Sequence, residues 1–509
     1  MLFTEPTFLF LFLPLLLALY FAPDLARVFG RSQPTAHGAY ANWLLLVASV
    51  IFYVKGGGAF TWLMLGSITF NYWMAIAVGR SGSPKTAKRW VAFAVTANLV
   101  VLGIYKYANF FVDNINTLSG AVGLARLDVP RVLLPIGISF FTFHAISYVI
   151  DVYRRDATAQ KSPVHAALYL LLFPQLIAGP IIRYRDIADQ LARRTVSIDD
   201  FACGVRRFII GLAKKVLIAN VVAGPADKIF AMPAAQLSPA HAWLGIVCYT
   251  LQIYFDFSGY SDMAIGLGRM FGFRFPENFR WPYIAASVQE FWRRWHISLS
   301  TWFRDYLYIP LGGNRVSPAR RYRNLITVFF LCGLWHGASW NFVIWGLWHG
   351  AFLVVERLVA DRNPQSLARR SVEDAKAAAV RNDTGVANWP IWPHLYTLAV
   401  VMIGWVFFRA ETLPAAIAFL KAMAGAAATA PTPYTVWWYL TPEVWLGLVA
   451  GAIGSAPWIA ALAPRLAREH DARLAAVRLL ATASLIALLV ASIMSMSART
   501  YNPFIYFRF

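Results

Sequence analysis

Apolar runs recur along almost the whole chain, and a soluble globule could not bury so many of them. In a membrane every backbone N–H and C=O must be hydrogen-bonded within the protein, so runs of this kind fold as helices. Several runs are shorter than the roughly 20 residues of a simple spanning helix, which indicates re-entrant or broken helices buried in protein or lining a wet cavity. The runs lie near residues 8–22, 41–54, 60–78, 90–104, 133–150, 165–182, 208–222, 241–255, 325–335, 341–355, 395–408, 444–462 and 477–496.

The composition agrees with a membrane protein. Hydrophobic residues make up 59% and charged residues 14% of the 509 residues, whereas a typical soluble domain carries about 25% charge. We therefore predict an all-α, polytopic membrane protein with roughly ten to thirteen membrane helices and further re-entrant or interfacial helices. No compositional break marks a second, soluble domain, so a single membrane domain is expected over residues 1–509.

The Lys and Arg residues that give a net charge of +21 sit in short loops between the apolar runs. This placement is typical of the cytoplasmic loops of multi-pass proteins, so it explains the charge without a nucleic-acid partner. Four arginines precede the last apolar run and two follow it, which predicts a C-terminus on the external, periplasmic side. The four are Arg465, Arg468, Arg473 and Arg478, and the two are Arg499 and Arg508.

Two aromatic-rich segments place histidines among apolar side chains. The first, QEFWRRWHISLSTWFRDYLYIPLGGNR at 289–315, contains His296, and the second, GLWHGASWNFVIWGLWHG at 333–350, contains His336 and His349. Ionisable groups at membrane depth are costly, which makes them functional candidates. A neutral imidazole accepts a proton near pH 7 and suits a general base. The alternative is that each histidine only forms a hydrogen bond to a neighbouring helix.

The two histidines of the second segment are separated by 13 residues. If the segment is one helix, this spacing rotates His349 by about 220° from His336, so the two side chains point to nearly opposite sides. They would then not share a site. We therefore assign His336 to the chemistry and His349 to a structural role.

Other common catalytic and metal-binding patterns are not present. The sequence has no HExxH motif, no Walker loop and no GxSxG motif, so zinc catalysis, nucleotide hydrolysis and an α/β-hydrolase nucleophile are not indicated. The three cysteines show no metal-ligand spacing, and no metal site is expected; they are Cys203, Cys248 and Cys332.

A further segment, YFDFSGYSDMAIGLGRMFGF at 254–273, places polar residues between apolar runs. These residues either line the same cavity as the histidines or join helices as a polar staple, and the sequence leaves both readings open. They are Asp256, Ser258, Tyr260 and Asp262.

The segments FWRRWHISLSTWFRDYLYIPLGGNR and LWHGASWNFVIWG resemble those of the membrane-bound O-acyltransferase family. Within this family the chain is similar to the alginate O-acetyltransferase-like branch of bacterial polysaccharide acetylation proteins. The stretches LLPIGISFFTFHAISYVIDVYR, AGPIIRYRD and YFDFSGYSDMAIGLG resemble that branch as well, so the likeness covers nearly the whole chain. It implies a funnel of helices around a tunnel that crosses the bilayer, with the catalytic core at about residues 130–360.

The resemblance also implies the chemistry. An acetyl thioester, acetyl-CoA above all, is expected as the donor substrate from the cytoplasm, and no bound cofactor is expected. His336 falls on the family's catalytic histidine, and His296 falls on its second functional position. Arginines near the two motifs would attract the donor's phosphates; they are Arg293, Arg294, Arg315, Arg320, Arg321 and Arg323.

The expected function is therefore transfer of acetyl groups across the bacterial inner membrane, among its lipids, for O-acetylation of an alginate-like exopolysaccharide. Members of this branch pass the acetyl group to a periplasmic acetyltransferase of the SGNH type, so a partner of that kind is implied. Two alternatives remain: a lipid-acylating member of the same family, and a transporter or channel in which the histidines relay protons. The sequence does not identify the polysaccharide.

The chain ends in NPFIYFRF at 502–509, an unusually aromatic terminus. It resembles short C-terminal aromatic motifs of related bacterial acyl-transfer systems, in which the hydroxyl of Tyr506 would serve as acyl acceptor or relay. The alternative is an interfacial anchor. No role is assigned to the polar stretch at 361–390.

Overall fold

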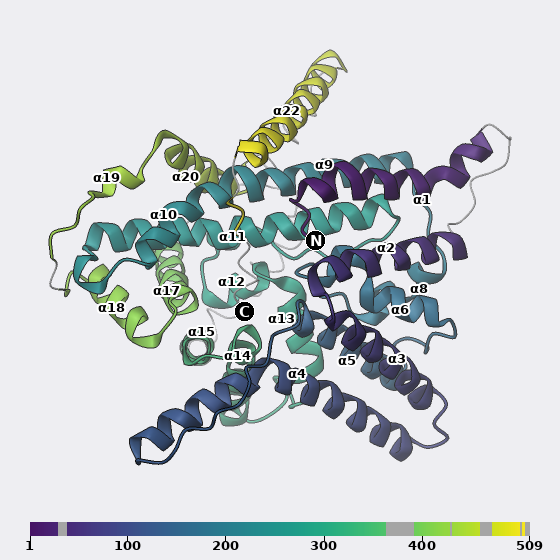
Figure 1. The fold of residues 1–509 in the computed structure, drawn as a ribbon, viewed down its shortest axis with the longest axis horizontal. Helices are drawn as coiled ribbons and strands as arrows, with labels where there is room; N and C mark the ends of the chain where they lie inside the picture. The colour runs from purple at the N-terminus through teal and green to yellow at the C-terminus, as the bar shows by residue number, and fades with distance from the viewer. Residues whose placement is uncertain (29–37, 363–390, 428–429, 459–470, 499–500, 504–509) are drawn as a thin grey trace. The chain divides into compact units, whose positions relative to one another are not determined.

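The computed structural model describes residues 1–28, 38–362, 391–427, 430–458, 471–498 and 501–503, and for 24–28 and 471–475 the backbone alone. Every regular element in these ranges is a helix (Figure 1). The predicted all-α class is therefore confirmed. From residue 363 on, the polar stretch at 361–390 lies outside the described residues, and so does Tyr506.

Seven helices of the described residues are long and apolar enough to cross a membrane, so the protein is a multi-pass membrane protein. Three shorter apolar helices add to them, at Phe8–Pro23, α18 (Leu413–Met423) and α20 (Pro442–Gly454). The seven are α2 (Ala39–Gly57), α3 (Phe60–Gly79), α4 (Pro84–Ala121), the continuous stretch Ile198–Phe230, α15 (Trp340–Arg362), α17 (Ile391–Arg409) and, within α22 (Asp471–Ala498), residues Ala476–Ala498.

The chain divides into two compact units. Unit 1 comprises Met1–Leu212 and Tyr260–Glu277, and unit 2 comprises Ala213–Gly259 and Asn278–Phe509. The single membrane domain over residues 1–509, with its core at about 130–360, stays a prediction.

Unit 1 is built from helices that enclose an aromatic core. Phe3, Phe8, Phe52 and Phe173 are fully buried, and the rings of Phe52 and Phe173 lie 5.4 Å apart. In addition to α2, α3 and α4 its helices are η1 (Phe8–Phe12), α1 (Leu13–Val28), α5 (Ile138–Arg154), α6 (Pro163–Leu171), α7 (Phe173–Leu176), α8 (Tyr184–Ala192), most of α9 (Ile198–Ala213) and the end of α11 (Pro239–Met270).

Two residues of the segment at 254–273 make side-chain contacts within unit 1. Asp262 accepts hydrogen bonds from Arg207 at 2.8 and 3.0 Å, and Arg207 also binds Glu277. Tyr260 stacks on Phe3 with ring centroids 4.5 Å apart. For Asp262 the structure supports the polar-staple reading, whereas the contact given for Tyr260 is between aromatic rings.

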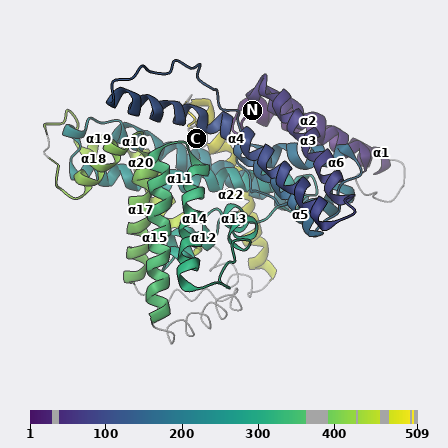
Figure 2. The same ribbon diagram turned by 90° about the horizontal axis from the view of Figure 1, so that it is seen from below.

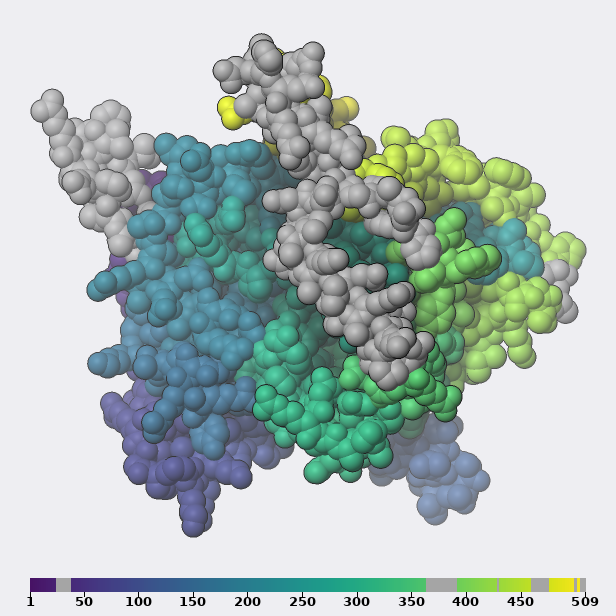
Figure 3. Space-filling model, turned by 180° about the vertical axis from the view of Figure 1, so that it is seen from behind, coloured from purple at the N-terminus to yellow at the C-terminus, as the bar shows by residue number. Residues whose placement is uncertain are grey.

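Unit 2 contains both histidine segments. Its helices α14 (Pro318–His336), α15 and α17 run side by side (Figure 2), and green atoms of this part of the chain reach the face seen from behind (Figure 3). The other elements are η2 (Lys214–Ala219), α10 (Asn220–Phe230), η3 (Ala234–Gln236), the beginning of α11, η4 (Pro282–Ile284), α12 (Val288–Arg294), α13 (Ile297–Phe303), η5 (Arg304–Tyr308), α18, α19 (Val436–Tyr439), α20 and α22.

Glycines let the backbones of α14 and α15 touch. A Cβ atom added at Gly333 would lie 2.3 Å from the carbonyl oxygen of Phe342, and one at Gly346 would lie 2.2 Å from that of Phe329. Small residues at such crossings are typical of helix pairs in membranes, where close van der Waals contact drives association. The hairpin of α14 and α15 therefore holds His336, at the end of α14, in a fixed place.

Candidate active site

His296 lies directly before α13, at its N-cap position, in a strained backbone conformation. Its backbone is left-handed, with φ 42° and ψ 54°, which is uncommon for a residue other than glycine. Two backbone hydrogen bonds hold it there, from Ile297 N–H to the carbonyl of Asn278 at 2.9 Å and from Ser300 N–H to the carbonyl of His296 at 3.0 Å. Strain of this kind costs about 1–3 kcal/mol and clusters at functional sites.

Asn278 determines which nitrogen of His296 carries the proton. Its Oδ1 atom accepts a hydrogen bond from the backbone N–H of Ser298 at 3.2 Å, so this atom must be the amide oxygen. The same oxygen lies 3.1 Å from Nδ1 of His296, which must therefore be the donor. The other ring nitrogen, Nε2, then carries a lone pair.

Nε2 of His296 is available for chemistry. The side chain is fully buried, and within the described part of the chain no hydrogen-bond partner reaches Nε2. His296 lies outside the seven candidate spans, and burial lowers the pKa of its imidazole well below the usual value. The ring is therefore neutral at physiological pH, as a proton acceptor requires.

His336 is the last residue of α14 and lies close to His296. Both imidazoles contact the indole of Trp335, with ring centroids 6.1 Å from His296 and 4.8 Å from His336. His336 is 5% exposed and also packs edge-on against Trp345 and Phe408. The structure thus brings the two predicted catalytic histidines into contact with one aromatic ring.

The second histidine segment is not one helix, which corrects the expectation from spacing. Helix α14 ends at His336 and α15 begins at Trp340, so the 220° argument does not apply. Instead His336 and His349 contact the same indole, Trp345, with ring centroids 4.8 and 5.2 Å away. The break occurs at Gly337, where a Cβ atom would lie 2.1 Å from the ring of Phe342.

His349 is nevertheless surrounded by packed side chains. It is fully buried, and its ring lies edge-on to Trp292 with centroids 5.2 Å apart. Neither ring nitrogen has a hydrogen-bond partner among the described residues. Gly404 of α17 approaches Nε2 so closely that a Cβ atom there would lie 2.7 Å away. Its assignment to a structural role stays a prediction.

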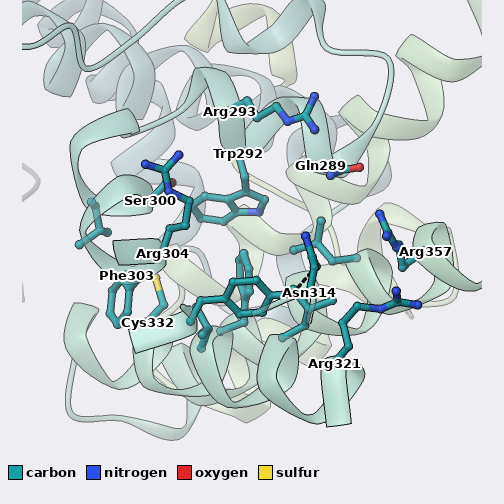
Figure 4. Close-up of a pocket in the computed structure, with 16 residues that line it drawn as sticks. Gln289, Trp292, Arg293, Ser300, Phe303, Arg304, Asn314, Arg321, Cys332 and Arg357 are labelled. Carbon is teal, nitrogen blue, oxygen red and sulfur yellow. Dashed lines mark hydrogen bonds between the residues drawn. The ribbon is translucent and has the colours of Figure 1, made fainter. Parts of the chain in front are cut away.

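A pocket of about 270 Å³ opens beside these residues in unit 2. Four elements contribute one arginine each, from α12, η5, α14 and α15, and these side chains surround it (Figure 4). Its wall is aromatic and aliphatic, and it includes Trp292, Phe303 and Cys332. Cys332 lies one helical turn before His336 on α14, so one end of the pocket approaches the histidine pair. The arginines are Arg293, Arg304, Arg321 and Arg357.

Three of these arginines lie within ion-pair distance of a carboxylate. Arg304 pairs with Asp305 at 2.8 Å, while Arg321 and Arg357 share one carboxylate, Asp361. Guanidinium groups around an apolar pocket fit a ligand with phosphate groups and a less polar arm.

The pocket contains some of the expected arginines and adds two others. Arg293 and Arg321 line it, as the sequence analysis expected, and Arg304 and Arg357 were not assigned. Arg294 instead pairs with Glu290 at 2.7 Å. The residues that line the pocket do not include Arg294, Arg315, Arg320 or Arg323. Arg304 lies inside the first motif and could have been chosen, whereas Arg357 follows the second motif and carried no signal of its own.

Metal chemistry was not expected from the sequence. Among the described residues no three His, Cys, Asp or Glu side chains gather in a way that could hold a metal ion.

Comparison with known proteins gives a consistent set of relatives. The sequence pattern of the MBOAT, membrane-bound O-acyltransferase family matches residues 58–372. The chain is 43% identical to the probable alginate O-acetylase AlgI of Pseudomonas putida over the full length of both chains. It is 37% identical to the peptidoglycan O-acetyltransferase of Helicobacter pylori, over 84% of this chain and 80% of that one. It is 30% identical to the teichoic acid D-alanyltransferase of Bacillus subtilis, over 41% of this chain and 55% of that one.

Proposed function

Because this chain belongs to the membrane-bound O-acyltransferase family, we propose that it moves acetyl groups from a cytoplasmic acetyl thioester to the outside of the cell for O-acetylation of an exopolysaccharide. The family makes it an acyltransferase of the membrane. The full-length likeness to an alginate O-acetylase favours an alginate-like polymer as the final acceptor. The bacterial inner membrane and an external C-terminus follow from this role and from the basic residues before the last apolar run.

The observation that carries the proposal is the position of the arginine-rimmed pocket one helical turn from His336. Acetyl-CoA has phosphate groups at one end and a flexible, less polar arm that ends in the thioester. The phosphates would bind the guanidinium groups of Arg293, Arg304, Arg321 and Arg357, and the arm would lie along the apolar wall. The thioester would then approach His336 and His296.

In the transfer step, the hydroxyl of Tyr506 attacks the thioester carbonyl carbon. His336 takes the hydroxyl proton, the new C–O bond forms, and the C–S bond breaks. His336 then returns the proton to the departing thiolate, so the products are free coenzyme A and O-acetyl-Tyr506. Neutral His296 would position or polarise the partner group through the lone pair on Nε2, since the single hydroxyl proton goes to His336. Base catalysis of this kind contributes typically about 10²–10⁴-fold.

The acetyl group then leaves on the external side. A hydroxyl of a periplasmic SGNH-type partner would attack the tyrosyl ester, which is more activated than an alkyl ester because a phenol of pKa about 10 is the leaving group. The tyrosine recovers its proton, and the partner passes the acetyl group to the polymer. Buried, packed surroundings around the histidines would limit loss of the thioester to water.

The test is the fate of a labelled acetyl group. Purified protein in liposomes receives acetyl-CoA labelled in the acetyl group, and the products are separated into protein, lipid and soluble fractions. Label on the C-terminal peptide of the wild-type chain, and none on a His336→Ala variant, is the expected result. Label in the lipid fraction would instead support a lipid-acylating enzyme. Intact acetyl-CoA together with proton flux would support the transporter alternative.

A further inference from the structure

Helix α12 has only seven residues, Val288–Arg294, so its position depends on what binds its ends. Isolated helices shorter than about 12–15 residues are marginal in water, and the first N–H groups of any helix lack a partner inside it. Here one carboxylate of α15 binds two of these groups. Glu356 accepts from the N–H of Val288 through Oε1 at 2.7 Å and from the N–H of Gln289 through Oε2 at 3.0 Å.

The third N–H group of α12 is bound by a neighbour in the sequence. Ser287 Oγ accepts from the N–H of Glu290 at 3.0 Å, and Glu290 accepts from the N–H of Ala286 at 2.9 Å. These local contacts begin the helix but do not place it. Glu356 is 67 and 68 positions away from the groups that it binds. Its contact therefore fixes where the start of α12 lies against α15.

Both of these helices line the arginine-rimmed pocket. Gln289, Trp292 and Arg293 come from α12, and Arg357 comes from α15 (Figure 4). Arg357 directly follows Glu356, which is not itself among the residues that line the pocket. A carboxylate that binds through both oxygens fixes direction as well as distance. The contact of Glu356 with α12 thus sets how Arg293 and Arg357 lie relative to each other.

The charge of Glu356 acts against its contact. By Coulomb attraction alone, a negative charge next to Arg357 weakens the binding of phosphate groups in the pocket. By holding α12, the same carboxylate favours binding, because Arg293 and Trp292 then stay in place. The two effects have opposite signs, so removal of the charge at nearly constant shape decides between them.

The far end of α12 is held by other contacts. The N–H of Arg280 donates to the carbonyl of Arg294 at 3.0 Å. Two residues later His296 is held by Asn278, with Nδ1 3.1 Å from Oδ1. A change at Glu356 should therefore disturb the pocket end of α12 and leave the histidine end in place.

We propose that Glu356 is a positioning residue for the acyl donor: its carboxylate holds the start of α12 against α15 and so sets the spacing of Arg293 and Arg357 across the pocket. The inference rests on the proposed binding of acetyl-CoA in this pocket. It goes further in naming a residue outside the pocket wall that controls the affinity for the donor.

Glu356→Gln tests the proposal in the full-length protein. The variant keeps the size of the side chain, but its NH₂ group cannot accept a hydrogen bond, so one of the two contacts with α12 is lost. Glu411→Gln is the matched control, because it removes the same charge from an exposed residue that does not line the pocket. The measurements are thermal unfolding, hydrogen exchange of residues 287–294 without ligand, calorimetric binding of coenzyme A, and kcat and KM for acetyl-CoA.

We expect hydrogen exchange at the start of α12 to be at least about tenfold faster in Glu356→Gln than in wild type. We expect Kd for coenzyme A and KM for acetyl-CoA to rise by about tenfold with kcat unchanged, because only the donor site is misplaced. Glu411→Gln should match wild type in every measurement. If Glu356→Gln does not fold, Glu356→Asp keeps the carboxylate on a shorter arm, and a smaller rise in Kd and KM is expected.

Tighter or unchanged binding of coenzyme A by a folded Glu356→Gln protein overturns the positioning role, because the loss of the contact would then not weaken the donor site. A fall in kcat with unchanged KM overturns it as well. Failure of the proposed donor is a different result: wild-type protein would bind no coenzyme A, while the difference in hydrogen exchange would remain. Equal exchange in wild type and Glu356→Gln overturns the hold on α12, whatever the donor is.

Discussion

Nδ1 of His296 lies 3.1 Å from Oδ1 of Asn278, and this contact leaves a lone pair on Nε2 of a fully buried imidazole. Burial lowers the pKa of His296, so protonation of this ring does not limit the wild-type enzyme near neutral pH. The activity that depends on neutral His296 is lost only as the pH falls through that lowered pKa. The acid side of the pH–rate profile should therefore show no step from His296 between pH 5 and 8.

Asn278→Asp should introduce such a step. A carboxylate beside Nδ1 favours the imidazolium form and raises the pKa of His296. Because the neutral ring is the active form, the acid limb of kcat/KM then moves to higher pH. The measurement is kcat/KM for acetyl-CoA at pH 5–9. A profile that overlays the wild type would show that His296 does not act through its lone pair.

His296→Asn is the companion change. Asn tolerates the left-handed backbone at this position better than most residues, so the fold should be kept while the imidazole is lost. We expect the transfer rate to fall by about 10²-fold with normal membrane insertion. An unchanged kcat together with unchanged donor affinity would reduce His296 to a packing residue.

His336→Ala should abolish acetylation while the protein accumulates in the membrane at normal levels. The loss expected for a general base is about 10²–10⁴-fold in kcat. His349→Ala is the comparison, because His349 contacts the same Trp345 ring as His336. It should mainly lower thermal stability, by about 1–3 kcal/mol for the cavity that it leaves. An equally complete loss of acetylation in a folded His349→Ala protein would reverse the two roles.

The sequence was sufficient to predict the helical membrane class and to select His296 and His336 as candidates, because both depend on local signals. Apolar runs indicate which segments are buried, and the long aromatic motifs indicate the family. The break at Gly337 was missed, since it depends on how closely Phe342 approaches. Arg357 joins the pocket only because α15 packs against α14.

The contacts of Lys215 also could not be predicted from the sequence. It lies in the apolar run at 208–222, and nothing nearby marks it as different from other basic residues. Its partners are Asp256 and Pro503, which are 41 and 288 positions away in the chain. Pairings over such separations are set by tertiary packing and leave no periodic pattern in the sequence.

Arg357→Gln should weaken donor binding without slowing the chemical step. Asp361 keeps Arg321 as a partner, so the fold should tolerate the change. Loss of one phosphate contact raises KM for acetyl-CoA by about tenfold at low salt, with little change in kcat. Arg320→Gln provides the matched comparison, because this exposed residue was expected to bind the donor but does not line the pocket. If both substitutions raised KM for acetyl-CoA equally, the arginines would attract the donor through their general positive charge and not through a specific binding site.

Gly346→Ala should disrupt the hairpin that carries His336. The added Cβ atom would lie 2.2 Å from the carbonyl oxygen of Phe329, so α14 and α15 must separate. We expect a loss of about 1–3 kcal/mol in stability from overpacking, together with reduced transfer. Gly103→Ala in α4 is the control, because nothing lies within 4 Å of its added Cβ atom. Thermal unfolding in detergent measures both, and equal stabilities would contradict the close helix contact.

Tyr506→Phe tests the acceptor itself, since it deletes one hydroxyl and keeps the aromatic side chain. If Tyr506 carries the acetyl group, label from acetyl-CoA no longer reaches the C-terminal peptide and the polymer stays unmodified. Full acetylation by Tyr506→Phe, with loss only when residues 504–509 are deleted, would mean that the segment anchors the protein or docks its partner and carries no acyl group.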